Sequence, residues 1–349
     1  MIANLPSSSP RPASRIATHL LRATFTLLTC AGIVFGTQLH ASDAGEKLLR
    51  KASRYFSPLP ATMPGAEHDT PERIALGEKL FFDPRLSVND TQSCASCHIL
   101  EPGKFGVDLL PVSPGAHGKL GTRNTPTVLN AGYQASQFWD GRAHDLAAQA
   151  GQPILNPVEM AMPDEQAVLD KLARIDEYRT AFAKAFPAAT EAISYPNLSE
   201  ALAAFQRTLR SPSRFDEFLG GKLQVLNEQE MRGLDTFMRA NCVRCHDGPL
   251  LGGQTFEKLG VYGDYANQTD MGRFEVTRDE ADRMVFKTSS LRNVAVTGPW
   301  YHDGAVSTLE EAVRNMAQLQ LQRRMSDAEV ADVVAFLGAL TDEARKAKP

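Results

Sequence analysis

Two short cysteine-containing motifs constrain this chain more than any other feature. They read 94-CASCH-98 and 242-CVRCH-246, each with two cysteines three positions apart and a histidine directly after the second. The chain has five cysteines, and the remaining one, Cys30, lies in an apolar run near the N-terminus. No cysteine pair is therefore left for a structural disulfide. The four cysteines of the two motifs are expected to form a specific functional site, and the fold has to accommodate it.

The N-terminus has the pattern of an export signal. Arg11, Arg15 and Arg22, with no acidic residue among them, precede the apolar run Ala23–Gly36. Ala41 offers a small residue for cleavage. We expect residues 1–41 to be removed and the mature protein to be periplasmic, without a stable membrane span, because the run is too short to cross a bilayer comfortably. A lipoprotein site at Cys30 and an uncleaved anchor are the alternatives.

The charge of the chain bears on its partners. The formal net charge is −4, and loss of the three signal arginines makes it −7. A mildly acidic surface argues against nucleic acid as a partner and permits a basic protein partner.

Hydrophobic periodicity predicts a mainly α fold with long loops and little sheet. The helices are expected at Asp43–Phe56, Pro71–Phe82, Asp164–Arg174, Glu177–Phe186, Leu198–Leu209, Glu228–Ala240, Thr308–Met316 and Asp327–Leu340. Ser307 with Glu310, and Ser326 with Glu329, fit the S-x-x-E capping box at two helix starts. Long Gly/Pro-rich segments at Glu101–Asn130, Gly151–Pro163 and Gly248–Val276 suggest loops that wrap a large cofactor.

The chain also has the pattern of a duplication. GEKLFF, CASCH, RNTPTV and FWDG occur in that order between Gly77 and Gly141, and GLDTFM, CVRCH, LRNVAV and WYHDG occur in the same order between Gly233 and Gly304. This order predicts two related domains, an N-terminal one at 42–210 and a C-terminal one at 211–349.

Covalent haem attachment accounts for every position of the two cysteine motifs. Zinc ribbons place their Cys pairs close together, whereas 144 residues separate Cys97 from Cys242. A redox dithiol needs a βαβ setting and has no use for the histidine. On a short helix, Cys94 and Cys97 share one face for two thioethers, and His98 can bind the iron. The same reasoning applies to Cys242, Cys245 and His246, so we expect two c-type haems.

The sixth iron ligands decide what each haem does, because a sulfur ligand raises the reduction potential and an open position permits chemistry at iron. The candidates are Met271, Met284, Met316 and Met325 for the second haem, and His117, His144 and His302 for the first. We favour Met316 and His117. Met325 has an alternative role as a hydrophobic staple against Val330, His144 as a capping or surface residue, and His302 as a local hydrogen-bonding residue.

With these residues in view, the chain resembles the bacterial dihaem cytochrome c peroxidases, a family that includes the MauG-like enzymes. The likeness runs from LGEKLFFDPRLS through CASCH, GTRNTPTVLNA and QFWDGRAHDLAAQA to LRNVAVTGPWYHDG. The resemblance implies two class I cytochrome c-like haem domains, a low-potential peroxidatic haem at His98 and a high-potential haem at His246. It also implies that His117 is a distal ligand that leaves on activation and that Met316 is the axial methionine, where MauG-like members have a tyrosine.

The same resemblance implies further site residues. Trp139 matches the tryptophan between the haems, and Gln149 and Glu159 match the pair that lines the peroxide pocket. A carboxyl beside peroxide can move a proton from the near to the far oxygen. Asn124, with the backbone carbonyls of Thr297 and Pro299, matches a calcium site, and oxygen ligands suit calcium.

The sequence therefore predicts a periplasmic dihaem peroxidase that reduces hydrogen peroxide with electrons from a small cytochrome c or cupredoxin. The family resemblance also implies a homodimer. Two alternatives remain open: a dihaem electron carrier without peroxidase activity, and a MauG-like enzyme that modifies a protein.

Overall fold

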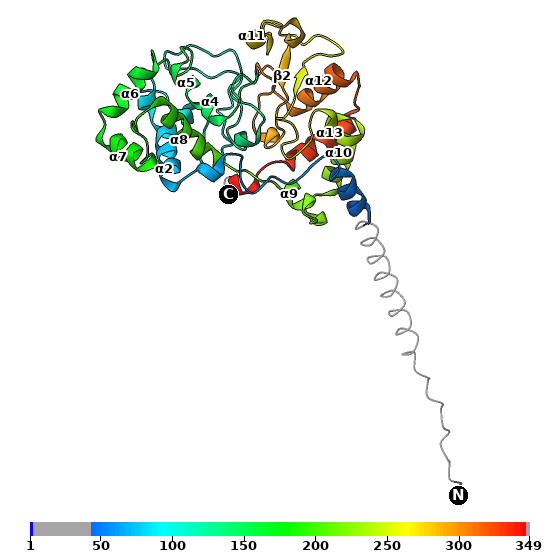
Figure 1. The fold of residues 1–349 in the computed structure, drawn as a ribbon. Coiled ribbons are helices and arrows are strands. Elements are labelled where there is room, and N and C mark those ends of the chain that lie inside the picture. Colours follow the sequence, from blue (N-terminus) through cyan, green and yellow to red (C-terminus); the bar gives the residue numbers. More distant parts are fainter. Residues whose placement is uncertain (3–42, 347–349) are drawn as a thin grey trace. The chain divides into compact units, whose positions relative to one another are not determined.

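The computed structural model describes residues 1–2 and 43–346, so the predicted signal peptide at 1–41 lies almost wholly outside the described residues. The chain divides into two units, Met1–Leu48 and Leu49–Pro349. The second unit contains both cysteine motifs (Figure 1). No helix of the described part of the chain has the length and apolar character needed to cross a membrane.

Short helices joined by long loops make up this second unit, which confirms the expectation of a mainly α fold (Figure 1). The α-helices are α2 (Pro71–Phe82), α3 (Cys94–Cys97), α4 (Leu146–Ala150), α5 (Gln152–Leu155), α6 (Glu165–Ala173), α7 (Asp176–Ala185), α8 (Tyr195–Arg207), α9 (Arg214–Leu219), α10 (Glu228–Arg239), α11 (Phe274–Thr277), α12 (Leu309–Leu321) and α13 (Asp327–Gly338). Among the 3-10 helices, η3 (Ala131–Tyr133), η5 (Cys242–Arg244) and η7 (Val294–Val296) bear on the site.

Regular sheet in the described residues is limited to one antiparallel pair. β1 (Phe256–Lys258) lies beside β2 (Val285–Lys287), with Phe256 opposite Lys287. The pair falls partly within the predicted loop Gly248–Val276, so this loop is not wholly irregular. The hydrophobic alternation over three residues is too short to have been recognised from the sequence.

Helix ends follow the local capping chemistry, and α8 and α12 depart most from the predicted bounds. α2 has the expected bounds, and the Thr70 side chain accepts a hydrogen bond from the Arg73 backbone N–H at its start. α8 begins at Tyr195, earlier than the expected Leu198, because Ser194 caps it and Pro196 is tolerated in the first turn.

The prediction for α12 was wrong at both ends. Thr308, not Ser307, is the N-cap, and its hydroxyl accepts from the Glu311 backbone N–H, so the register of the capping pair is one residue later. The helix also continues to Leu321, which places Met316 in its interior rather than at its end. The Ser326–Glu329 capping box of α13 is confirmed.

The same helix crossing occurs twice. α2 packs on α8, and α10 packs on α13. A Cβ on Gly77 would lie 1.8 Å from the carbonyl oxygen of Ala201, and one on Gly233 would lie 1.9 Å from that of Asp332. In both pairs a phenylalanine four residues further along packs against the same glycine. Each crossing therefore needs glycine for backbone contact, and the duplication extends to the packing of the helices.

A second match corrects the alignment of the two copies. The sequence pairs Asn124 of RNTPTV with Asn293 of LRNVAV, but the backbone counterpart of Asn293 is Asn130. Asn130 and Asn293 have φ of 62° and 60°, precede the 3-10 helices η3 and η7, and both form hydrogen bonds with Ser211. The shared letters RN had suggested a different register, which the backbone conformation does not support.

Both copies then continue through the same turn. Residues with positive φ stand eight and eleven positions after each asparagine, Phe138 and Gly141 in the first copy and Tyr301 and Gly304 in the second. The turn consequently places Trp139 and His302 at the same position of the two copies.

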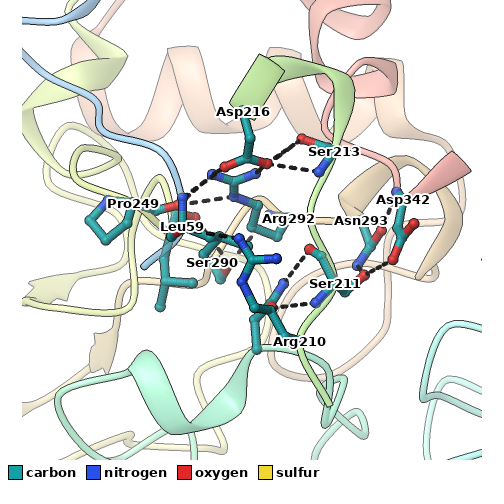
Figure 2. A network of polar contacts seen from close by, with 12 residues as sticks. Leu59, Arg210, Ser211, Ser213, Asp216, Pro249, Ser290, Arg292, Asn293 and Asp342 are labelled. Carbon is teal, nitrogen blue, oxygen red and sulfur yellow. Dashed lines mark hydrogen bonds and ion pairs between the residues drawn. The ribbon is translucent and has the colours of Figure 1, made fainter. Parts of the chain in front are cut away.

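The segment that joins the copies is held by a buried polar network (Figure 2). The Arg292 side chain is 1% exposed, and its guanidinium donates to Asp216 at 2.9 Å and to the Pro249 carbonyl at 2.7 Å. Ser211 donates to Asp342 at 2.9 Å in the same network. Leu49–Pro349 form one compact unit, and the domain boundary at 210/211 stays a prediction.

Candidate functional site

The first cysteine motif forms a short helix at the wall of a cavity. α3 begins after Ser93 in a capping box and carries Cys94 and Cys97 one turn apart, with His98 directly after it. These three residues line a cavity of about 630 Å³. The His98 Nδ1 lies 3.2 Å from the Gly106 carbonyl oxygen. The predicted arrangement of two cysteines and a histidine around one space is therefore present.

The second motif reaches the same arrangement through a tighter turn. Cys242 and its neighbours form the 3-10 helix η5 rather than an α-helix. His246 Nδ1 lies 3.0 Å from the Leu251 carbonyl oxygen. Cys242, Cys245 and His246 line a second cavity of about 210 Å³.

The four thiols are neutral and unpaired. Burial raises the pKa of Cys94 to about 12, and burial likewise raises the pKa values of Cys97, Cys242 and Cys245 to about 11. None of the four forms a disulfide. Among the described residues no group of three or more His, Cys, Asp or Glu side chains could hold a metal ion. A low-pKa redox thiol requires the opposite shift.

The two histidines fit the role of iron ligand. Burial lowers the pKa of both His98 and His246, so each imidazole is neutral. A neutral ring that donates from Nδ1 to a backbone carbonyl keeps Nε2 free as a metal ligand. With the adjacent thiols and cavities, the donor sets fit one covalently attached haem each.

Glu159 and Gln149 both line the larger cavity, together with Cys94 and His98. Burial raises the pKa of Glu159, although a hydrogen bond of 2.6 Å from Asn156 to its Oε1 opposes the shift. A carboxyl group that exchanges a proton with a substrate is helped by a pKa above the usual range, because the optimal catalytic pKa lies near the working pH.

Trp139 lines both cavities. Its indole N–H donates to the Asn124 carbonyl at 2.9 Å, and its ring meets His302 edge-on with centroids 6.5 Å apart. His302 is 1% exposed, and its Nε2 has no hydrogen-bond partner. It lines the second cavity, so the pair of rings lies where the two cavities approach each other.

His117 lies outside the larger cavity. It is exposed at the tip of a short hairpin, in which Gly115 N–H donates to the Lys119 carbonyl at 2.9 Å and Pro114 pairs with Leu120. Gly115, at the base of this hairpin, does line the cavity. His144, the second histidine considered for the first haem, is exposed and lies 3.2 Å from Asp145.

Two of the four candidate methionines reach the second cavity. Met316, on α12, and Met325, just before α13, both line it. Met271 and Met284 are not among its lining residues. Met271 instead accepts a hydrogen bond from Arg283, and Met284 is buried in an apolar cluster with Leu259, Tyr265 and Phe286.

The structure shows where the three residues of the predicted calcium site lie. Asn124, Thr297 and Pro299 all line the larger cavity. The Asn124 side-chain N–H donates to the carbonyls of Leu110 and Pro111 at 3.0 and 3.3 Å. The family resemblance implies that these residues form a calcium site, which stays a prediction.

Sequence reasoning missed a charged cluster and a buried lysine beside Trp139. Arg123 donates to Asp140 at 2.5 Å and to Asp270 at 2.7 Å. Lys287 is 8% exposed and lines both cavities. No spacing rule links residues so far apart, and a single lysine in a three-residue strand carries no signal of its own.

Comparison with known proteins gives a consistent result. The model of the di-haem cytochrome c peroxidase family matches residues 71–224. Cytochrome c551 peroxidase of Nitrosomonas europaea is 41% identical over 84% of this chain and 85% of its own length. Methylamine utilization protein MauG of Methylophilus methylotrophus is 32% identical over 90% of this chain and 96% of its own. The crystal structure of a MauG-like protein associated with microbial copper homeostasis superimposes with a TM-score of 0.73, at 32% identity, over 83% of this chain and 95% of that one.

Proposed function

The chain belongs to the di-haem cytochrome c peroxidase family and is an oxidoreductase that acts on hydrogen peroxide, and on this premise we propose how its residues divide the work. Peroxide is reduced in the larger cavity, beside the haem of Cys94, Cys97 and His98. Cys242, Cys245 and His246 would hold the haem that receives electrons, and Trp139, which lines both cavities, would lie on the path to the first site. The haems supply the redox chemistry, and the protein supplies proton transfer, positioning and electron entry.

Glu159 carries this proposal. It is a half-buried carboxyl group on the wall of the cavity that also holds His98, and desolvation raises its pKa. Its carboxylate takes a proton from the near oxygen of peroxide and returns it to the far oxygen, which is the leaving group. Gln149, in the same cavity, orients the substrate through its amide.

The proposal that electrons enter at the second site is based on the residues that line the second cavity. Met316 lines the cavity where Cys242, Cys245 and His246 would hold a haem, and it would supply a sulfur ligand, which raises the reduction potential. Relatives are named for cytochrome c551, which supports a small cytochrome c as donor, and a cupredoxin is the second candidate. The export pattern of residues 1–41 supports a periplasmic location.

His117 has the properties of a removable ligand. Its exposed hairpin is anchored at the cavity wall through Gly115, so a swing of the tip moves the imidazole toward or away from the site. We assign it to the first haem in the oxidised resting protein.

One experiment tests the proposal directly. Half-reduced holoprotein is mixed with peroxide and a reduced small cytochrome c, and both oxidation of the cytochrome and the haem spin state are followed. We expect oxidation of the cytochrome and a high-spin haem once the protein is half-reduced. No cytochrome oxidation together with no high-spin haem would leave the protein a dihaem electron carrier.

A MauG-like modification of a protein substrate is the second candidate, favoured by the 32% identity to a MauG protein. Met316 argues against it, because the MauG-like members have a tyrosine at the matching position. In that case the protein would turn over peroxide while oxidising reduced cytochrome c poorly.

Calcium and dimerisation complete the proposal. Asn124 with the carbonyls of Thr297 and Pro299 would hold Ca²⁺ through oxygen ligands. Exhaustive chelation should lower activity, and Ca²⁺ but not Mg²⁺ should restore it. A homodimer is expected from the family resemblance, and sedimentation of the mature protein tests it.

A further inference from the structure

The Lys287 side chain is a buried cation without an acidic partner. It is the last residue of β2, and its side chain is 8% exposed. Its ammonium donates to the Gln134 side-chain oxygen, which is a neutral acceptor. None of the ion pairs among the described residues involves Lys287.

Asp140, the acid whose charge acts on Lys287, is already paired with two arginines. Asp140 is 4% exposed and accepts hydrogen bonds from Arg123 at 2.5 Å and from Arg142 at 2.9 Å. Burial lowers the pKa of Lys287 to about 7, and the negative charge of Asp140 only partly opposes this shift. An isolated charge inside a protein is costly unless an opposite charge accompanies it.

The position of Lys287 indicates where that opposite charge comes from. The residue lines both the cavity of His98 and the cavity of His246. Its backbone N–H also donates to the Trp139 carbonyl at 2.8 Å, so it stands beside the residue proposed to connect the two sites. A haem carries two carboxylate side chains, and these must lie somewhere in or at the mouth of its cavity.

We propose that the Lys287 ammonium binds carboxylate groups of the haems and sets their reduction potentials. This inference rests on the proposed placement of one haem in each cavity. A fixed positive charge favours the haem state that holds one more electron, so it raises the potential of each haem that it approaches. Gln134 holds the ammonium in place from the other side.

The test compares reduction potentials of holoprotein variants. Lys287→Met removes the charge at similar length, Lys287→Gln removes it and keeps a hydrogen-bonding end, and Lys287→Arg retains it. Lys258→Met is the matched control, because Lys258 is the exposed last residue of the paired strand β1. Both haem potentials are measured by spectroscopic redox titration, with haem content measured in parallel.

We expect a downward shift of at least one haem potential in both uncharged variants, with Lys287→Arg and Lys258→Met close to the unmodified protein. Loss of haem in the uncharged variants but not in Lys287→Arg would support the proposal equally. Potentials equal to those of Lys258→Met, or equal damage in Lys287→Arg and Lys287→Met, would overturn it. Peroxide turnover is measured separately, so a protein with shifted potentials but no peroxidase activity would contradict the proposed function alone.

Discussion

Burial gives Glu159 a proton affinity that an exposed glutamate lacks. Its side chain faces the larger cavity, and desolvation raises its pKa despite the hydrogen bond from Asn156. A carboxylate is needed to take the proton from peroxide, so the group is active only above its own pKa. The raised value brings that limit toward neutral pH.

We expect Glu159→Gln to lower peroxide turnover by about 10²–10⁴-fold, the usual contribution of a general acid–base group. In the unmodified protein turnover should fall as the pH drops through the raised pKa, and this acid limb should disappear from the residual activity of the variant. Steady-state kinetics against pH provides the measurement. Glu165→Gln, at the exposed start of α6, is the control, and equal losses in both variants would contradict the role of Glu159.

Met316 and Met325 provide a matched pair, because both line the cavity of His246. We expect Met316→Leu to lower the potential of the second haem, since loss of the sulfur ligand favours the oxidised iron. Met325→Leu should leave the potential close to its original value. Redox titration distinguishes the two, and the reverse pattern would make Met325 the ligand.

At the scale of elements, the repeated crossing of α2 with α8 and α10 with α13 depends on glycine. No side chain fits at Gly233, because the Asp332 carbonyl occupies the position of a Cβ. At Gly338, near the end of α13, a Cβ would meet nothing within 4 Å. The same substitution should therefore have opposite effects at the two positions.

We expect Gly233→Ala to lower the free energy of unfolding by about 1–3 kcal/mol or more through overpacking. Gly338→Ala should raise it by about 0.4–1 kcal/mol, because alanine restricts the unfolded chain. Denaturant unfolding of the two holoproteins tests both signs. If Gly233→Ala left the free energy of unfolding unchanged, α10 and α13 would be able to move apart without loss of stability.

At the scale of the whole molecule, the network in Figure 2 connects the joining segment to the C-terminal half. Burial tends to raise the pKa of Asp216, but Arg292 and backbone N–H groups outweigh it and the pKa lies below its usual value. A lowered folded-state pKa contributes stability that is present above the unfolded pKa and is lost as the pH falls through the folded one.

We expect Asp216→Asn to lower the free energy of unfolding by about 3–5 kcal/mol, because it leaves Arg292 buried without its counter-charge. The variant should also lose part of the dependence of stability on pH in the acid range. Asp327→Asn removes the partner of Arg314 at a side chain that is 97% exposed, and it should cost less than about 1 kcal/mol. Denaturant unfolding at several pH values measures both variants, and similar losses would argue against the network.

Local pattern was sufficient for much of the fold. Apolar periodicity located the long helices, and the Ser326–Glu329 pair predicted the start of α13, because capping depends on residues three positions apart. Local pattern did not decide between neighbouring N-cap candidates, as at Ser307 and Thr308. It also misaligned the two copies, because matching letters suggested that Asn124 rather than Asn130 was the counterpart of Asn293. Short elements such as β1 and β2 carry too few residues for a periodic signal.

The sequence by itself determined the attachment chemistry, because two cysteines and a histidine within five residues form their geometry locally at Cys94–His98 and Cys242–His246. Only the tertiary structure decided which distant groups share those sites. It brought Glu159 into the cavity of His98, left His117 outside that cavity, and placed Lys287 between both cavities. Such placements depend on how separate helices and loops pack, and neither the spacing nor the type of one residue encodes them.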